Sequence, residues 1–73
     1  MTRDEWIQAF AADLGVEPPD ADTIEVLLEM AGVAAHASER TAAPLACYLL
    51  GRAQADAAHG LATARAVAPE PGA

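Results

Sequence analysis

Alanine dominates this chain and limits how large a core it can build. Twenty of the 73 residues are alanine, whereas only three are aromatic. An alanine methyl group buries little area, and buried apolar area stabilises a fold by about 25 cal/mol per Å². Alanine also favours helices, so the composition indicates one small helical domain. Its thin core leaves room for a protein partner or a second copy of the chain to supply further burial.

The charge of the chain narrows the kinds of partner it can bind. The net charge is −7, and all four basic residues are arginine. Nucleic acids and anionic membranes attract clustered positive charge, so we expect neither a nucleic-acid nor a membrane partner. Nine acidic residues and one arginine lie in residues 1–39. This acidic half could dock on a basic partner, but a solvated surface that maintains solubility is the simpler interpretation.

The single cysteine and the lack of a recognisable targeting signal predict a cytoplasmic protein without a metal centre. A single cysteine, Cys47, allows neither an intrachain disulfide nor a multi-cysteine metal site. It lies in an apolar run, which favours a buried small side chain over a nucleophile. No signal peptide precedes the acidic start, and no apolar stretch approaches the roughly 18 residues of a membrane span.

The first helix is predicted over residues 3–14. Thr2 and Glu5 have the spacing of a capping box, and apolar residues then recur at helical spacing. Gly15 can end the helix because glycine tolerates the left-handed conformation. We interpret Trp6 as the largest piece of the core, the alternative being an exposed anchor for a partner.

Two further helices are predicted over residues 23–37 and 42–66. Asp22 is the expected N-cap of the second helix, whose two apolar stripes indicate a central position in the bundle. Thr41 is the expected N-cap of the third, and Pro44 falls in its first turn, where a missing N–H costs nothing. Alanines continue the third helix, but its second half has few large side chains. That half is expected either to fray or to pack closely on a partner.

These elements predict an all-α fold, a small three-helix bundle with a disordered C-terminal tail. The domain is expected over residues 1–67 and the tail over 68–73. No phosphate loop, dinucleotide fingerprint, metal spacing or catalytic triad is present, so we expect no enzyme activity, no catalytic or metal-binding residue and no cofactor. Acyl carrier proteins are acidic and helical too, but they need a serine where this chain has Thr23.

The densest polar cluster lies at the turn between the second and third helices. It comprises His36, Glu39, Arg40 and Thr41. Arg40 lies next to the N-terminus of the third helix, where a phosphate or a partner carboxylate could bind. The simpler interpretation is that His36 and Arg40 cap the carbonyl groups at the end of the second helix, with Glu39 paired to either.

Four segments of the sequence together carry a family resemblance. Its less specific parts are Asp4-Glu5-Trp6, Asp13-Leu14-Gly15-Val16 and Val26-Leu27-Leu28-Glu29-Met30-Ala31. Its most specific part runs from Ala34 to Leu45 and is followed by Tyr48-Leu49-Leu50-Gly51. Over residues 4–66 the chain resembles a small uncharacterised actinobacterial helical domain. That domain occurs alone or attached to molybdenum cofactor guanylyltransferase-like proteins, and near formate dehydrogenase accessory genes.

This resemblance implies a non-catalytic accessory or interaction domain linked to molybdenum cofactor maturation or to a molybdenum enzyme. His36, Arg40 and Pro44 match the family motif, and with Glu39 and Thr41 they form the candidate interaction site. Thr41 departs from the proline common in the family, which leaves the turn more flexible. The alternative function is a self-associating structural bundle, a homodimer without a small-molecule ligand, paired through its second or third helix.

Overall fold

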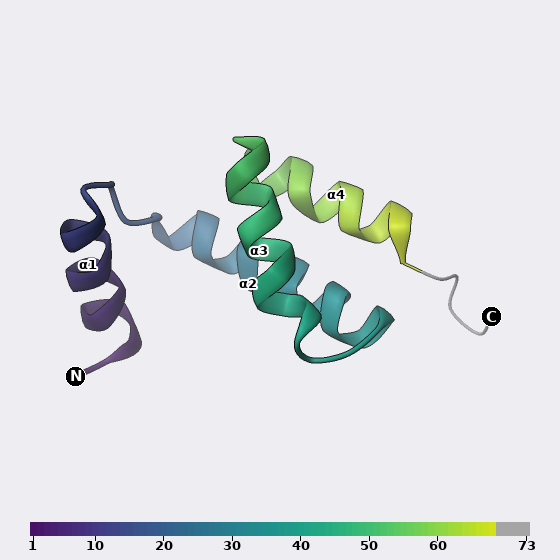
Figure 1. Cartoon of the computed structure of the whole chain (residues 1–73), viewed down its shortest axis with the longest axis horizontal. Coiled ribbons are helices and arrows are strands. Elements are labelled where there is room, and N and C mark those ends of the chain that lie inside the picture. The colour runs from purple at the N-terminus through teal and green to yellow at the C-terminus, as the bar shows by residue number, and fades with distance from the viewer. Residues whose placement is uncertain (69–73) are drawn as a thin grey trace.

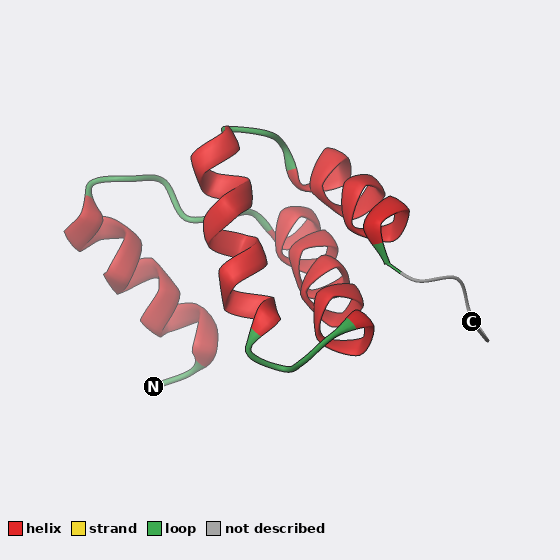
Figure 2. Cartoon of the chain, turned by 45° about the vertical axis from the view of Figure 1, so that its right-hand side comes forward, coloured by secondary structure: helices red, strands yellow, loops and turns green. Residues whose placement is uncertain are grey.

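The computed structural model describes residues 1–68, and within them the chain is helical, without a strand (Figures 1 and 2). The helices of this part are α1 (Arg3–Leu14), α2 (Ala21–Ala37), α3 (Ala42–Ala53) and α4 (Ala57–Val67). The all-α prediction is confirmed, but the prediction of three helices is wrong. In the predicted tail, Ala68 is the C-cap of α4, and residues 69–73 lie outside the described part.

Helix α1 has the bounds and the caps that the sequence predicts. The Thr2 hydroxyl accepts a hydrogen bond from the Glu5 amide at 3.1 Å, and the Glu5 carboxylate accepts one from the Thr2 amide at 2.7 Å. At the other end Gly15 adopts a left-handed conformation with φ 78°. Both caps join residues close in sequence, which is why the local pattern predicts them.

Helix α2 begins earlier than predicted, because Asp20 rather than Asp22 is its N-cap. The Asp20 carboxylate accepts a hydrogen bond from the Thr23 amide at 2.8 Å. Asp20 has the extended backbone that an N-cap requires, and it directly follows Pro18-Pro19, whose rings hold the chain out of a helix. Asp22 therefore lies inside the first turn.

The predicted helix over residues 42–66 is divided at residues 54–56. Gln54 turns into the left-handed conformation with φ 57°, and the Asp56 carboxylate accepts a hydrogen bond from the His59 amide at 2.8 Å, which starts α4. A straight helix of 25 residues would extend about 37 Å, too far for both halves to lie on one short neighbour. The break allows α4 to fold back onto α2.

We expect Asp56→Ala to destabilise α4 by about 1 kcal/mol, because it removes the carboxylate that accepts a hydrogen bond from the His59 amide in the first turn. The check is a urea denaturation curve followed by far-ultraviolet circular dichroism. Asp56→Ser is the matched control, because serine retains a capping oxygen and should lose only a fraction of that amount. Equal losses in the two variants would show that the Asp56 cap does not hold α4.

The caps of the first two helices also predict how stability responds to acid. Hydrogen bonds from the backbone and the side chain of Thr2 lower the pKa of Glu5 below 4.5, and hydrogen bonding to the side chain and backbone of Thr23 lowers the pKa of Asp20 below 3.8. A carboxylate whose pKa is lower in the folded state stabilises the fold above its unfolded pKa. That contribution disappears as the pH falls through the folded value.

We therefore expect the double variant Glu5→Gln, Asp20→Asn to melt at a lower temperature than the wild type at pH 6, and the gap to narrow below about pH 4. Thermal melts of both proteins from pH 6 down to about pH 3 test this. A gap that stays constant down to about pH 3 would show that the two carboxylates do not act through their charged forms.

Helix α2 is central, as its two apolar stripes predict, because α3 and α4 both pack on it. Figure 2 shows these three helices side by side. The closest approach is at Gly60, where a Cβ atom would lie 2.7 Å from Cδ1 of Leu50 and 2.9 Å from Sδ of Met30. A glycine on α4 thus lets that helix sit directly against side chains of α3 and α2. The second half of the predicted third helix packs closely, but on its own chain.

Helix α1 lies at one end of the molecule, next to the start of α2 (Figure 1). The extensive helix contacts of the described chain join α2 to α3 and α2 to α4, and α1 takes part in none of comparable size. The prediction that Trp6 fills the core is consequently wrong. Its side chain is 52% exposed, because no neighbouring helix lies over that side of α1.

Candidate functional site

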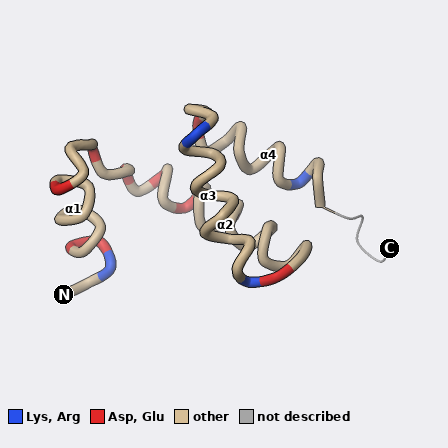
Figure 3. The backbone as a smooth tube through the Cα atoms, in the orientation of Figure 1, with Lys and Arg blue, Asp and Glu red and all other residues tan. Residues whose placement is uncertain are grey.

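The candidate interaction residues lie in and beside the loop that joins α2 to α3. His36 is in the last turn of α2, and Thr41 immediately precedes α3. All five members are exposed: His36, Glu39, Arg40, Thr41 and Pro44. Basic and acidic positions lie next to each other in this loop (Figure 3). The structure thus brings the cluster together at one exposed corner.

The predicted capping by His36 and Arg40 is not what ends α2. Among residues 1–68, the side chains of His36, Glu39 and Arg40 form no hydrogen bond or ion pair with one another. The Ser38 hydroxyl instead donates to the Ala34 carbonyl at 3.0 Å. Backbone bonds hold the loop: the Ala42 amide donates to the Glu39 carbonyl at 2.9 Å, and the amide of the next residue to the Arg40 carbonyl at 3.2 Å. The charged side chains of the corner are therefore free to meet a partner.

Thr41 precedes α3 as predicted, but its side chain makes no capping hydrogen bond. Its backbone is already in the helical region, with φ −69° and ψ −12°, whereas a capping side chain needs an extended backbone. The turn that begins at Glu39 continues into the helix, and this geometry leaves the Thr41 hydroxyl available at the surface. Pro44 falls in the first turn, as predicted.

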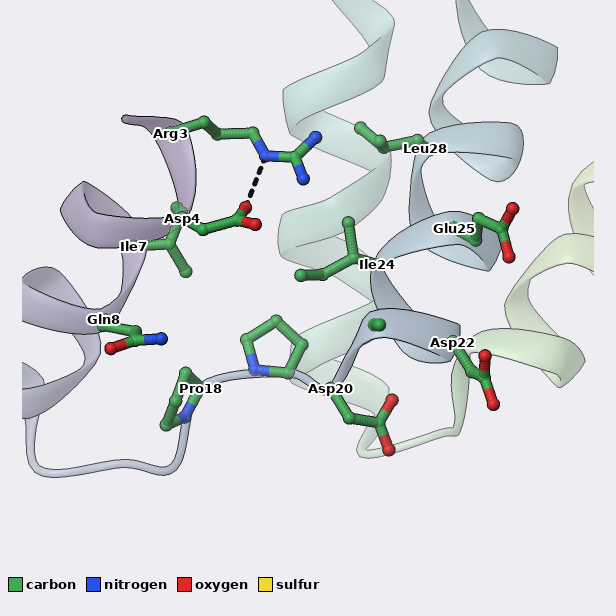
Figure 4. A pocket seen from close by; sticks show the side chains of 12 residues that line it. Arg3, Asp4, Ile7, Gln8, Pro18, Asp20, Asp22, Ile24, Glu25 and Leu28 are labelled. Carbon is green, nitrogen blue, oxygen red and sulfur yellow. Dashed lines mark hydrogen bonds and ion pairs between the residues drawn. The ribbon is translucent and has the colours of Figure 1, made fainter. Parts of the chain in front are cut away.

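A groove that the sequence does not reveal lies between α1 and the first half of α2, at the opposite end of α2 from the loop (Figure 4). Its volume is about 590 Å³. Its apolar lining comprises Ile7, Pro18, Pro19, Ala21, Ile24 and Leu28. Four acidic residues lie along its edges, Asp4, Asp20, Asp22 and Glu25; Asp4 points between the two helices, whereas Asp22 and Glu25 point away from α1 (Figure 4). The residues come from two helices and their connector, so no local pattern in the sequence groups them.

The groove has a strongly negative rim. Its single basic lining residue, Arg3, donates from Nε to Oδ1 of Asp4 at 2.8 Å, so the charge of this arginine is shared with a neighbouring carboxylate. The acidic positions of the described chain concentrate on α1, the connector and the start of α2 (Figure 3). Apolar surface under a negative rim fits a ligand that is both apolar and positively charged.

The outer sides of α1 and α3 carry a second kind of exposed apolar surface. On α1, Trp6 and Phe10 stack with ring centroids 4.9 Å apart and an interplanar angle of 25°. On α3, Leu45, Tyr48 and Leu49 point away from the neighbouring helix, and the Arg52 guanidinium lies 6.0 Å from the Tyr48 ring centroid. The helical spacing in the sequence predicts that the members of each set lie on one side of their helix. It does not show which side of α3 turns outward.

The amino-acid sequence matches one protein family, described as a domain of unknown function, over residues 1–71. The chain belongs to the DUF6457 family. No curated protein and no solved structure matches this DUF6457 domain. Within residues 1–68, no helix of the domain has the length and apolar character needed to cross a membrane.

The described part of the DUF6457 domain has several exposed features but no cluster of metal-ligating side chains. No group of three or more His, Cys, Asp or Glu side chains in residues 1–68 could hold a metal ion. Cys47 is half-buried, on the side of α3 opposite Tyr48 and Leu49. The charged corner, the groove with its acidic residues and the outer sides of α1 and α3 are the exposed features of the described chain.

Proposed function

We propose that this DUF6457 chain is a non-catalytic helical interaction domain that binds a protein partner in the cytoplasm. The observation that supports this proposal is the amount of apolar side chain at the surface. Of the described hydrophobic residues, Ala11 and Met30 alone are buried, whereas large apolar side chains on α1 and α3 and in the groove are exposed. Contiguous exposed apolar surface bordered by charge is typical of protein interaction sites.

The groove between α1 and α2 is the place for a foreign partner. An amphipathic helix with basic residues would place its apolar side against Ile24 and Leu28 and its charges against the acidic rim. Arg40 and its neighbours in the loop offer a second contact, suited to a carboxylate on the partner. The partner implied by the family resemblance is a protein of molybdenum cofactor maturation or a molybdenum enzyme.

Affinity capture from a native extract, with the full chain as bait and mass spectrometry as readout, tests both parts of the proposal. We expect a molybdenum-cofactor protein to be enriched. We expect Leu28→Lys to reduce its recovery about tenfold or more, because the substitution removes apolar contact and repels a basic partner. Val67→Lys is the matched control, since this residue is exposed on α4 and remote from the groove.

Each outcome of the capture addresses a separate part of the proposal. Equal recovery by Leu28→Lys and wild type would place the contact elsewhere, and loss with Arg40→Glu would then place it at the loop. A wild-type bait that enriches no molybdenum-cofactor protein would overturn the partner class implied by the resemblance.

A self-associating helical bundle is the second candidate function. It is favoured by a separate observation, the matching exposed sides of α1 and α3. These sides differ from the groove, so self-association and binding of a foreign partner can occur in one assembly.

A further inference from the structure

We propose that two copies of the chain form a symmetric dimer in which the aromatic face of α1 packs on the outer face of α3 of the other copy. The aromatic face of α1 comprises Trp6, Phe10 and Leu14. The outer face of α3 comprises Leu45, Tyr48, Leu49 and Arg52. The inference rests on the proposed interaction function and names a second copy of this chain as a partner.

The accessible surface is too large for a compact monomer of this mass. It is 5724 Å², whereas a compact monomer of 7.5 kDa exposes about 4,200 Å². Residues 69–73 can account for at most about 650 Å² of the difference, the value for fully extended chain. Each copy therefore exposes at least about 850 Å² more than a compact monomer, which is close to the roughly 800 Å² that each partner of a standard-size interface buries.

The two faces match in length and in spacing. Helices α1 and α3 each have 12 residues, so each presents a stripe about 18 Å long. Phe10 lies four residues after Trp6, and Leu49 lies four residues after Leu45. These side chains are about half exposed or more, with Phe10 at 49% and Leu49 at 64%. Two stripes of this kind pack by inserting the side chains of one between those of the other.

Charge favours pairing α1 with α3 over pairing like helices. Helix α1 contains three acidic residues, Asp4, Glu5 and Asp13, and one arginine that is already paired with Asp4. Helix α3 contains no acidic residue, and Arg52 lies at the end of its outer face. Packing α1 on a second α1 would bring carboxylates together, whereas packing it on α3 places them near a guanidinium.

The geometry of a single chain holds these two faces apart. The inner side of α3 packs on α2, so its outer face is directed away from the rest of the chain. Helix α1 is joined to α2 through Gly15, Pro18-Pro19 and the Asp20 cap, and in Figure 1 it lies apart from α3, with which it makes no extensive contact. In a dimer with a two-fold axis the α1–α3 contact occurs twice. The aromatic face of α1 and the outer face of α3 are then covered in both copies.

The first measurement is the mass of the full chain by sedimentation equilibrium, from about 1 µM to about 500 µM. We expect a dimer that dissociates on dilution. Trp6 is the one tryptophan of the chain, so its fluorescence emission should shift to shorter wavelength as the dimer forms. A monomer at every concentration overturns the proposal, as does a dimer whose formation leaves the Trp6 emission unchanged.

The second measurement uses Phe10→Glu and Leu49→Glu, each of which places a carboxylate in one of the two faces. We expect either variant alone to raise the dissociation constant by about 100-fold or more, because the damaged contact occurs twice. Val67→Glu is the matched control, with 80% exposure on α4, and should dimerise like the wild type. Circular dichroism verifies that each variant remains helical, and Phe10→Ala and Leu49→Ala serve if a charged variant unfolds.

Mixing the two variants distinguishes cross-pairing from pairing of like helices. A dimer of Phe10→Glu with Leu49→Glu contains one contact with both partners damaged and one intact contact, whereas each variant's own dimer contains two damaged contacts. We therefore expect the mixture to form a heterodimer more tightly than either variant dimerises alone. Absence of this rescue overturns the cross-pairing of α1 with α3.

Failure of this inference differs from failure of the proposed function. A chain that is monomeric but captures a molybdenum-cofactor protein overturns the dimer alone. A chain that dimerises as described but captures no such protein overturns the foreign partner alone.

Discussion

Met30→Ala is expected to unfold most of the chain in water at room temperature. Met30 is 2% exposed, and its sulfur lies against Gly60 of α4. Truncating a buried methionine to alanine costs about 2–5 kcal/mol, whereas a core in a chain of this size rarely supplies more than about 3–5 kcal/mol. Because the described chain has so few buried side chains, no other part of the core can compensate.

The measurement is urea denaturation followed by circular dichroism, with the helical signal of Met30→Ala expected to be largely lost before urea is added. Met30→Leu is the matched control, because a swap of similar volume costs less than about 1.5 kcal/mol. An unfolding free energy for Met30→Ala within about 1 kcal/mol of the wild type would mean that the contact among α2, α3 and α4 is not the core of this fold.

Gly60→Val is expected to displace α4 and to destabilise the chain by about 2 kcal/mol. Any Cβ at this position would lie 2.7 Å from Cδ1 of Leu50, 2.9 Å from its Cδ2 and 2.9 Å from Sδ of Met30. Valine gains a few tenths of a kcal/mol in helix propensity over glycine, which is too little to offset the forced repacking of two side chains.

Gly51→Val provides the control for this substitution. Gly51 is exposed on α3, and a Cβ there meets no atom within 4 Å, so its variant should stay within about 0.5 kcal/mol of the wild type. Urea denaturation of both variants gives the comparison. A Gly60→Val chain as stable as Gly51→Val would mean that α4 approaches Leu50 and Met30 less closely than the structure has it.

The candidate site was predictable in part. Helix ends and turns are local, so the sequence places His36, Glu39 and Arg40 correctly beside one turn. Which side chain bonds the last carbonyl groups of α2 depends on competition among nearby side chains. There the Ser38 hydroxyl donates a hydrogen bond to the Ala34 carbonyl. The groove between α1 and α2 was not predictable, because its lining becomes contiguous only when the connector sets the two helices beside each other.

The sequence by itself determined the features that arise within three or four residues of one another. The capping box of Thr2 and Glu5, the left-handed turn at Gly15 and the apolar spacing of α2 are of this kind. Each depends on hydrogen bonds or side-chain spacing within one helix, so the residues that form it are visible in the sequence.

The tertiary structure decided what each helix covers. It divided the alanine-rich segment at residues 54–56, turned Cys47 and Leu50 inward and Tyr48 outward on α3, and left Trp6 half exposed on α1. Local pattern cannot make these choices, because they depend on which surfaces α2 has available for neighbours far away in the sequence. Burial is a property of the whole arrangement, and here α2 has room for α3 and α4 while most of the apolar surface of α1 stays exposed.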